Sequence, residues 1–164
     1  MSKPQISIIA CHHVGSLVYK FVESVKRSTG VTYEIIIVTS DEDLAINGIK
    51  DCWVHYDTGM PAAKRNTGVR VAKANYIAFF DDDVEIEPDC LYQLLSAVKE
   101  HSTGMVFGKL LNAEFTDRFD EAGSYLTWSG FLWARAESGC KDIGQFDKQA
   151  ADLPEMARLH AGVA

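Results

Sequence analysis

The sequence has no excess of basic residues, no closely spaced pair of cysteines and no long apolar run. Its 16 Lys and Arg against 23 Asp and Glu give a formal net charge of −7, which disfavours a nucleic-acid-binding face and a polybasic membrane anchor. No apolar stretch approaches the roughly 18 residues that a membrane span needs, and the first one is too short for a signal peptide. We therefore expect no nucleic-acid partner, no transmembrane segment and a cytoplasmic location, with peripheral attachment at the inner membrane face left open.

The sequence also lacks the motifs of several common enzyme classes. It contains no Gly-x-Gly-x-x-Gly, no Walker loop and no Gly-x-Ser-x-Gly elbow, which are the phosphate cradles and nucleophile turns of large families. A Ser–His–Asp device cannot be placed by spacing. Its four cysteines, Cys11, Cys52, Cys90 and Cys140, are too dispersed in a chain of 164 residues to suggest a disulfide scaffold, so we expect them to be reduced and mostly packed.

Short apolar segments alternate along the chain with amphipathic helical patterns. Strands are predicted at Ile6–Cys11, Tyr33–Val38, Cys52–Tyr56 and Tyr76–Phe80. Helices are predicted from the Ser16 cap to Gly30, from Pro61 to about Lys73, and from Pro88 onward. This alternation is typical of right-handed βαβ units on a parallel sheet. We predict an α/β fold: a three-layer α/β/α sandwich with a mostly parallel, Rossmann-like sheet.

The pattern weakens after about Gly104. We predict a strand over Met105–Leu111 and then a hairpin or long loops. The chain is thus expected to be a single domain, with a βαβ core over residues 1–112 and a variable region over residues 113–164. Trp128 and Trp133 lie in a Gly-rich stretch; core packing is the expected role, and a sugar-stacking platform is the alternative.

Polar clusters follow three of the predicted strands: Cys11-His12-His13, Thr39–Asp43 and Asp81-Asp82-Asp83. Ligands of open parallel sheets bind beyond the carboxyl ends of the strands, so we expect the binding site there. For His12 and His13 we expect a structural or ligand-lining role, because adjacent side chains point in different directions and do not suit joint metal ligation.

The three consecutive aspartates repel one another, and burying them unpaired is costly. A Mg²⁺ ion, which takes one or two carboxylates plus phosphate oxygens, resolves the repulsion. Lys64 and Arg65 follow Pro61 at a helix start, where free N–H groups and the helix dipole favour an anion. An exposed acidic turn and a solvated basic turn are the alternatives. Together the two clusters favour a metal–diphosphate ligand.

The run from Met60 to Leu91 resembles the nucleotide-sugar half of family 2 glycosyltransferases, which have the GT-A fold of nucleotide-diphospho-sugar transferases. The motifs that carry the resemblance are Arg65-Asn66-Thr67-Gly68, Tyr76-Ile77-Ala78-Phe79, Asp81-Asp82-Asp83 and Pro88-Asp89, in the family's order and spacing. The segments Phe119–Gly123 and Gly144–Asp147 resemble the variable middle of a rhamnosyltransferase-like subgroup.

The resemblance implies a nucleoside-diphosphate sugar donor and residue roles at its site. Asp83 would coordinate Mg²⁺ or Mn²⁺ bridging the donor diphosphate, with Asp81 acting on the metal or the ribose and Asp82 flanking them. Arg65, with Lys64, would touch the nucleotide. The ends of the first two strands, with Cys11, Ser40 and Asp41, would hold the base.

The chain departs from the family pattern at three places. Ala10-Cys11-His12-His13 replaces the usual Pro-Thr/Ser-Tyr-Asn, and Thr39-Ser40-Asp41-Glu42 replaces Asp-Asp-Gly-Ser, so Asp41 is a nearby substitute for the base-reading aspartate. Family members are usually longer, and their later part supplies the acceptor surface and an acidic general base. We expect that half to be absent and the general base to lie beyond Ala164, so no catalytic residue is assigned and the domain is expected to be truncated.

The resulting hypothesis is an inverting glycosyltransferase that moves a sugar to an unknown acceptor, a saccharide or a lipid-linked glycan. Inversion needs a carboxylate to accept the acceptor proton, and the metal stabilises the leaving diphosphate; this chain would hold the donor and metal half. The alternatives are a non-catalytic nucleotide-sugar-binding module or inactive fragment and, more weakly, a metal-dependent nucleotidyltransferase. An uncovered apolar surface is expected to favour self-association.

Overall fold

The structure is a computed structural model that describes residues 3–100, 104–126, 128–136 and 138–146. The chain divides into two compact units, Met1–Tyr92 and Gln93–Ala164. The division falls inside helix α4, Cys90–Glu100, which is earlier than the expected limit at residue 112. The single-domain organisation stays a prediction, and each unit is described by itself.

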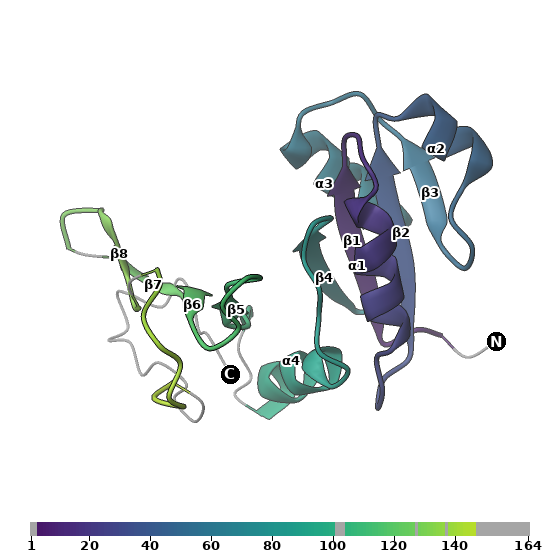
Figure 1. Cartoon of the computed structure of the whole chain (residues 1–164). Helices are drawn as coiled ribbons and strands as arrows, with labels where there is room; N and C mark the ends of the chain where they lie inside the picture. The colour runs from purple at the N-terminus through teal and green to yellow at the C-terminus, as the bar shows by residue number, and fades with distance from the viewer. Residues whose placement is uncertain (1–2, 101–103, 127, 137, 147–164) are drawn as a thin grey trace. The chain divides into compact units, whose positions relative to one another are not determined.

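The first unit is built on a parallel four-stranded sheet (Figure 1). Its strands are β1 (Ile6–His12), β2 (Tyr33–Thr39), β3 (Trp53–Tyr56) and β4 (Tyr76–Asp81), in the order β3-β2-β1-β4. Strands β1 and β2 are buried almost throughout, which fits their unalternating apolar sequences, because a central parallel strand is covered on both faces. The predicted parallel sheet is confirmed.

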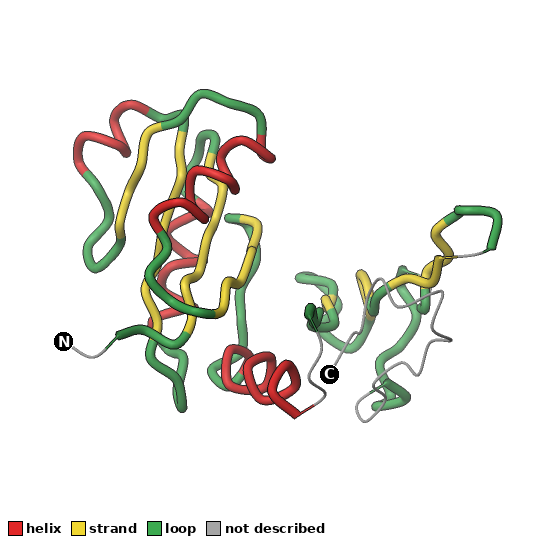
Figure 2. Tube along the Cα trace, turned by 180° about the vertical axis from the view of Figure 1, so that it is seen from behind, coloured by secondary structure: helices red, strands yellow, loops and turns green. Residues whose placement is uncertain are grey.

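Helices cover both faces of this sheet, as the front and back views show (Figures 1 and 2). Helix α1 (Leu17–Lys26) lies on one face, where its Phe21 ring lies 5.8 Å from the ring of Phe80 in β4. Helix α3 (Pro61–Val71) lies on the other face and packs against β1 and β2. The predicted α/β/α layering is therefore confirmed.

The closest approach of helix and sheet is at Gly68, which stands over Ile9. A methyl group added at Gly68 would lie 2.5 Å from Ile9 Cγ2, so only glycine lets α3 come this near. Ile9, Ile36 and Val38 form the buried cluster beneath α3, with Val71 and Ala72 packed on it. The glycine of the Arg-Asn-x-Gly motif thus sets the depth at which α3 lies on the sheet.

Two differences from the sequence prediction lie at the carboxyl ends of β1 and β2. The polar turn expected at Thr39–Asp43 contains the start of a short helix, α2 (Glu42–Asn47), capped by Asp41, whose carboxylate accepts a hydrogen bond from Leu44 N at 3.0 Å. Strand β1 continues through His12, so this histidine belongs to the sheet. A six-residue helix is too short for an amphipathic pattern to reveal it.

The second unit contains two small antiparallel sheets. One pairs β5 (Leu110–Leu111) with β6 (Phe119–Glu121), and the other pairs β7 (Ser124–Leu126) with β8 (Leu132–Ala134). The predicted hairpin is confirmed, but only the last two residues of the predicted strand Met105–Leu111 form β5. The predicted variable region beyond residue 146 lies outside the described residues.

The structure tests the expectations for the two tryptophans of this unit and for the four cysteines of the chain. The side chains of Trp128 and Trp133 are 100% and 71% exposed, so the expectation of core packing for them is wrong. All four cysteines are free, as predicted, although Cys140 is exposed. Within the described ranges, no helix combines the length and the apolar character that a membrane crossing requires.

Candidate functional site

The candidate site lies at the carboxyl edge of the sheet, at its upper end in Figure 1. Strands β1, β2 and β4 end there at His12, Thr39 and Asp81, because parallel strands bring their carboxyl ends to one edge. The residues predicted from sequence that fall at or just beyond these ends, or at the start of α3, are Cys11, Ser40, Asp41, Lys64, Arg65, Asp81, Asp82 and Asp83.

Arg65 and Asp81 form an exposed ion pair on the α3 side of this edge. Arg65 Nη2 donates to Asp81 Oδ1 at 3.3 Å, and the two side chains are 40% and 73% exposed. Because neither group is buried, the pair adds little to stability. Both groups remain accessible to a ligand that carries negative charge and a metal.

Lys64 has a different role from its neighbour Arg65. It is only 5% exposed, and its ammonium donates to the carbonyl oxygen of His12 at 2.7 Å and to Ser40 Oγ at 3.0 Å. The buried lysine therefore links the end of β1 to the residue that follows β2 through these two hydrogen bonds. Its predicted contact with a nucleotide stays a prediction.

Cys11 lies between α3 and the acidic turn on the same face of the sheet. Its thiol donates a weak hydrogen bond to Pro61 O at 3.6 Å. Burial raises the pKa of this thiol, and the nearby Arg65 and Lys64 offset the effect only in part. The predicted contact of Cys11 with the donor stays a prediction.

Asp82 points to the opposite side of the sheet from Asp81 and contacts His12. His12 is 1% exposed, and its Nδ1 is hydrogen-bonded to Asp82 Oδ2. An ionised carboxylate can only accept, so with Asp82 ionised the donor of this hydrogen bond is Nδ1. The buried Nε2 has no hydrogen-bond partner among the described residues. Sequence reasoning missed this pair, because the residues are 70 positions apart and nothing in either motif points to the other.

Asp83, the third aspartate, is exposed and forms no hydrogen bond or ion pair with another described residue. In the part of the chain that the structure describes, no group of three or more His, Cys, Asp or Glu side chains is arranged so that it could hold a metal ion. Two exposed carboxylates, Asp81 and Asp83, are nevertheless the oxygen ligands that Mg²⁺ takes when phosphate oxygens and water complete its shell. The donor set therefore fits such an ion in the presence of a phosphorylated ligand.

The segment that follows the acidic turn is fixed to α1. Ile86 N donates to Ser24 Oγ at 3.2 Å, and this buried hydroxyl donates in turn to Phe21 O at 2.7 Å. Further along, Thr29 N donates to Pro88 O at 2.8 Å. The segment after the aspartates is thus held by hydrogen bonds to Ser24 in α1 and to Thr29 just beyond that helix.

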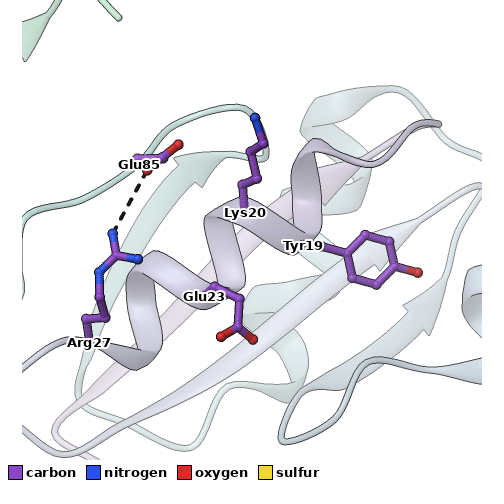
Figure 3. A pocket seen from close by; sticks show the side chains of 5 residues that line it. All are labelled: Tyr19, Lys20, Glu23, Arg27 and Glu85. Carbon is purple, nitrogen blue, oxygen red and sulfur yellow. Dashed lines mark ion pairs between the residues drawn. The ribbon is translucent and has the colours of Figure 1, made fainter.

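A surface hollow lies elsewhere, along α1 (Figure 3). Its lining is Tyr19, Lys20, Glu23, Arg27 and Glu85. All five residues are exposed, and Arg27 and Glu85 pair across it at 3.9 Å. Because its charges are balanced and it is wide open to solvent, the hollow supplies no ligand chemistry comparable to that of the carboxyl edge.

Comparison with known families agrees with this geometry. Residues 7–135 match the family described as glycosyl transferase family 2. The match includes the parallel sheet, the acidic turn and Arg65. The chain belongs to glycosyl transferase family 2.

Curated relatives and solved structures of this family are similar to the chain over part of their length. EpsH of Bacillus subtilis (strain 168) is 28% identical over 127 residues, which is 71% of this chain and 36% of EpsH. The poly(ribitol-phosphate) beta-N-acetylglucosaminyltransferase TarP of Staphylococcus aureus (strain N315) is 27% identical over 107 residues, covering 58% of this chain and 33% of TarP. The chain therefore spans about a third of the length of these relatives.

Solved structures of S. aureus TarS share the fold. TarS 1–349 in complex with UDP-GlcNAc aligns with a TM-score of 0.55 and 16% identity, over 74% of this chain and 39% of TarS. TarS 1–349 alone aligns with a TM-score of 0.53 and 19% identity, over 65% and 35%. This likeness confirms the expected GT-A-type architecture.

Proposed function

We propose that the carboxyl edge binds a nucleoside-diphosphate sugar together with Mg²⁺ or Mn²⁺, as the donor side of an inverting glycosyltransferase. The observation that carries the proposal is the placement of Arg65 against Asp81, next to the exposed Asp83. A guanidinium and two accessible carboxylates at the edge where parallel sheets bind ligands suit a diphosphate bridged by a divalent cation.

The metal would be held by Asp83, with Asp81 as a second ligand. When bound, the cation would neutralise charge on the diphosphate as it leaves the sugar. Arg65 has a planar fork that can bind phosphate oxygens in two places at once, so a donor diphosphate would draw it away from Asp81. The exchange frees the Asp81 carboxylate for the metal or the ribose.

The base would lie at the ends of β1 and β2. Ser40 Oγ lies 2.8 Å from His13 Nδ1 and accepts from Lys64, and Asp41 follows it. Although the Asp41 carboxylate caps α2, its two oxygens can accept several hydrogen bonds, so capping and base recognition are compatible. Since the TarS structure holds UDP-GlcNAc, a uridine diphosphate is the first ligand to test.

Transfer itself would require a carboxylate that accepts the proton of the acceptor hydroxyl. We assign no described residue to this step, and the acceptor, a saccharide or a lipid-linked glycan, follows only from the family resemblance. The chain thus accounts for donor and metal binding, and inversion stays an expectation drawn from the family.

The test is calorimetric titration of the chain with UDP, with and without Mn²⁺. We expect Mn²⁺ to tighten UDP binding, and Asp83→Asn to abolish that gain without unfolding the protein. Asp51→Asn is the matched control, because Asp51 lies before β3 at the opposite edge of the sheet and its φ of 66° is one that asparagine accommodates. Equal UDP affinity with and without the metal would overturn the proposal.

Turnover is measured separately from binding. UDP-GlcNAc is incubated with the chain and Mn²⁺, and release of UDP is followed over time. Release that Asp83→Asn abolishes supports a transferase or hydrolase activity of the chain. Metal-dependent binding without release favours the alternative of a nucleotide-sugar-binding module.

A further inference from the structure

We infer that His12 is a positioning residue for the acidic turn, holding Asp82 so that Asp81 and Asp83 face a metal–diphosphate ligand. The inference rests on the proposed function and adds to it a residue that positions the metal-binding turn. It starts from the hydrogen bond between His12 Nδ1 and Asp82 Oδ2, which joins the end of the central strand β1 to the turn after the edge strand β4.

His12 connects three other elements through two different atoms. Its carbonyl oxygen accepts from the buried ammonium of Lys64 in α3, which also binds Ser40 at the end of β2. Its ring reaches Asp82 beyond β4. His12 therefore links the end of β2, where a base would bind, to the turn after β4, where a metal would bind.

The burial of His12 argues against a mere packing role. An apolar side chain could fill this space without leaving a polar atom unsatisfied, yet Nε2 is buried with no partner among the described residues. A buried unpaired nitrogen is unfavourable. The histidine gains only the Nδ1 contact in return, so that contact is the feature that explains the ring's presence.

Each of the three aspartates has a different environment, and this difference indicates what the contact between His12 and Asp82 does. Asp81 faces Arg65 on the α3 side, whereas Asp82 faces His12 on the other side. Asp83 has no partner in the described part of the chain. With Asp82 fixed from behind and Ile86 fixed to Ser24 further along, the turn holds Asp83 outward, toward solvent and ligand.

The test compares two substitutions of one residue. His12→Asn keeps a side-chain N–H where Nδ1 donates, and His12→Leu fills similar space without a donor. The readout is the ratio of UDP dissociation constants without and with Mn²⁺, measured by calorimetry on the full chain, together with the melting temperature of each variant. His55→Asn in β3 is the control, because β2 and β1 separate that strand from β4.

We expect His12→Leu to reduce the Mn²⁺-dependent gain in UDP affinity by about tenfold or more, the usual effect of losing a group that orients a metal ligand. His12→Asn should restore most of that gain even if both variants melt earlier. UDP binding without metal should change by less than about twofold, as for sites that are not coupled. A merely structural role would instead leave the ratio unchanged, because a smaller folded fraction lowers both apparent affinities by the same factor.

The inference is overturned if His12→Leu keeps the wild-type ratio, or if His12→Asn loses as much as His12→Leu. Should His12→Leu fail to fold, Asp82→Leu and Asp82→Asn give the same comparison from the partner's side. Absence of any Mn²⁺-dependent UDP affinity in the wild type would overturn the proposed function itself. A wild type with that affinity and an indifferent His12→Leu variant would overturn the positioning role alone.

Discussion

Gly68 and Ile9 are in such close contact that no side chain fits between them. A Cβ at Gly68 would lie 2.5 Å from Ile9 Cγ2 and 3.3 Å from two further atoms of the same side chain. The glycine stands in the middle of α3, where glycine weakens a helix relative to alanine. Glycine is needed there because it lets α3 pack closely against the sheet. The position of α3 in turn fixes where Lys64 and Arg65 lie.

Gly68→Ala is expected to destabilise the protein by about 1–3 kcal/mol, because overpacking forces helix and sheet apart. Thermal unfolding followed by circular dichroism measures the effect. Gly104→Ala is the control, since nothing lies within 4 Å of a Cβ built there. Ile9→Ala should make the two substitutions less than additive, and full additivity would contradict the contact.

Lys64→Met is expected to lower the free energy of unfolding by about 1–3 kcal/mol, because the carbonyl of His12 and the hydroxyl of Ser40 lose a buried donor. Methionine keeps a flexible chain of similar length, so the change isolates the ammonium. Urea denaturation measures it, with the exposed Lys50→Met as control. An unchanged midpoint would mean that water replaces the ammonium without penalty.

The lowered pKa of Asp57 predicts how the free energy of unfolding depends on pH. The Thr67 hydroxyl donates to its carboxylate at 2.6 Å and Gly59 N–H at 2.7 Å, and these bonds hold the pKa of Asp57 below its ordinary value of 3.8. A carboxyl whose pKa is lower in the folded state stabilises the fold above the unfolded pKa, and this stabilisation is lost as pH falls through the folded pKa.

Asp57→Asn should therefore lower the melting temperature near neutral pH and make the decline in acid shallower. Melting curves recorded from about pH 2 to pH 6 measure both effects. Asp51→Asn, whose carboxylate receives no comparable pair of hydrogen bonds, should leave the slope in acid unchanged. Parallel curves for wild type and Asp57→Asn would contradict the prediction.

The cysteines should differ in reactivity. Burial raises the pKa of Cys52 and of Cys90 to about 11, so at pH 8 only about one thiol in a thousand is ionised at either site. Iodoacetamide labelling of the folded protein, read by mass spectrometry, should leave both largely unmodified, and unfolding in urea should release them. Labelling of Cys52 or Cys90 at the rate of a free thiol would show that the site is open.

Self-association is expected from the exposed indoles of the second unit. Trp128 and Trp133 are 100% and 71% exposed, and large exposed apolar side chains favour contacts between molecules. Static light scattering should give a mass that rises with protein concentration, and Trp133→Ser should reduce that rise. A constant monomer mass at high concentration would contradict the expectation.

The sheet and α1 could be predicted because their apolar patterns are strong, whereas α3 was predicted from the proline at its first turn. The buried strand Tyr33–Thr39 carries an unbroken run of β-branched residues from Ile35 to Thr39, Ile6–His12 is mostly apolar, and α1 has a clear apolar stripe. Helix α2 escaped prediction because Glu42–Asn47 is shorter than two turns, and in the second unit only Leu110–Leu111 of the longer apolar run became strand. Short elements depend on tertiary contacts that local sequence does not display.

The sequence predicted which residues would lie at the carboxyl edge, but it did not predict which of them contact one another. The rule that ligands meet the carboxyl ends of parallel strands singled out the aspartates, and the helix start after Pro61 singled out Arg65. The burial of Lys64 and the bond between His12 and Asp82 depend on residues brought together from distant parts of the chain. No periodicity or spacing encodes such pairs.

The division of Asp81 and Asp82 between opposite sides of the sheet makes the length of β4 critical. Successive residues of a strand alternate between faces, so deleting one residue between Tyr76 and Phe80 would move Asp82 into the place of Asp81. The carboxylate now held by the histidine would then meet the guanidinium, and its neighbour would turn inward. The number of residues in β4 therefore matters to the acidic triplet as much as the identity of the three aspartates.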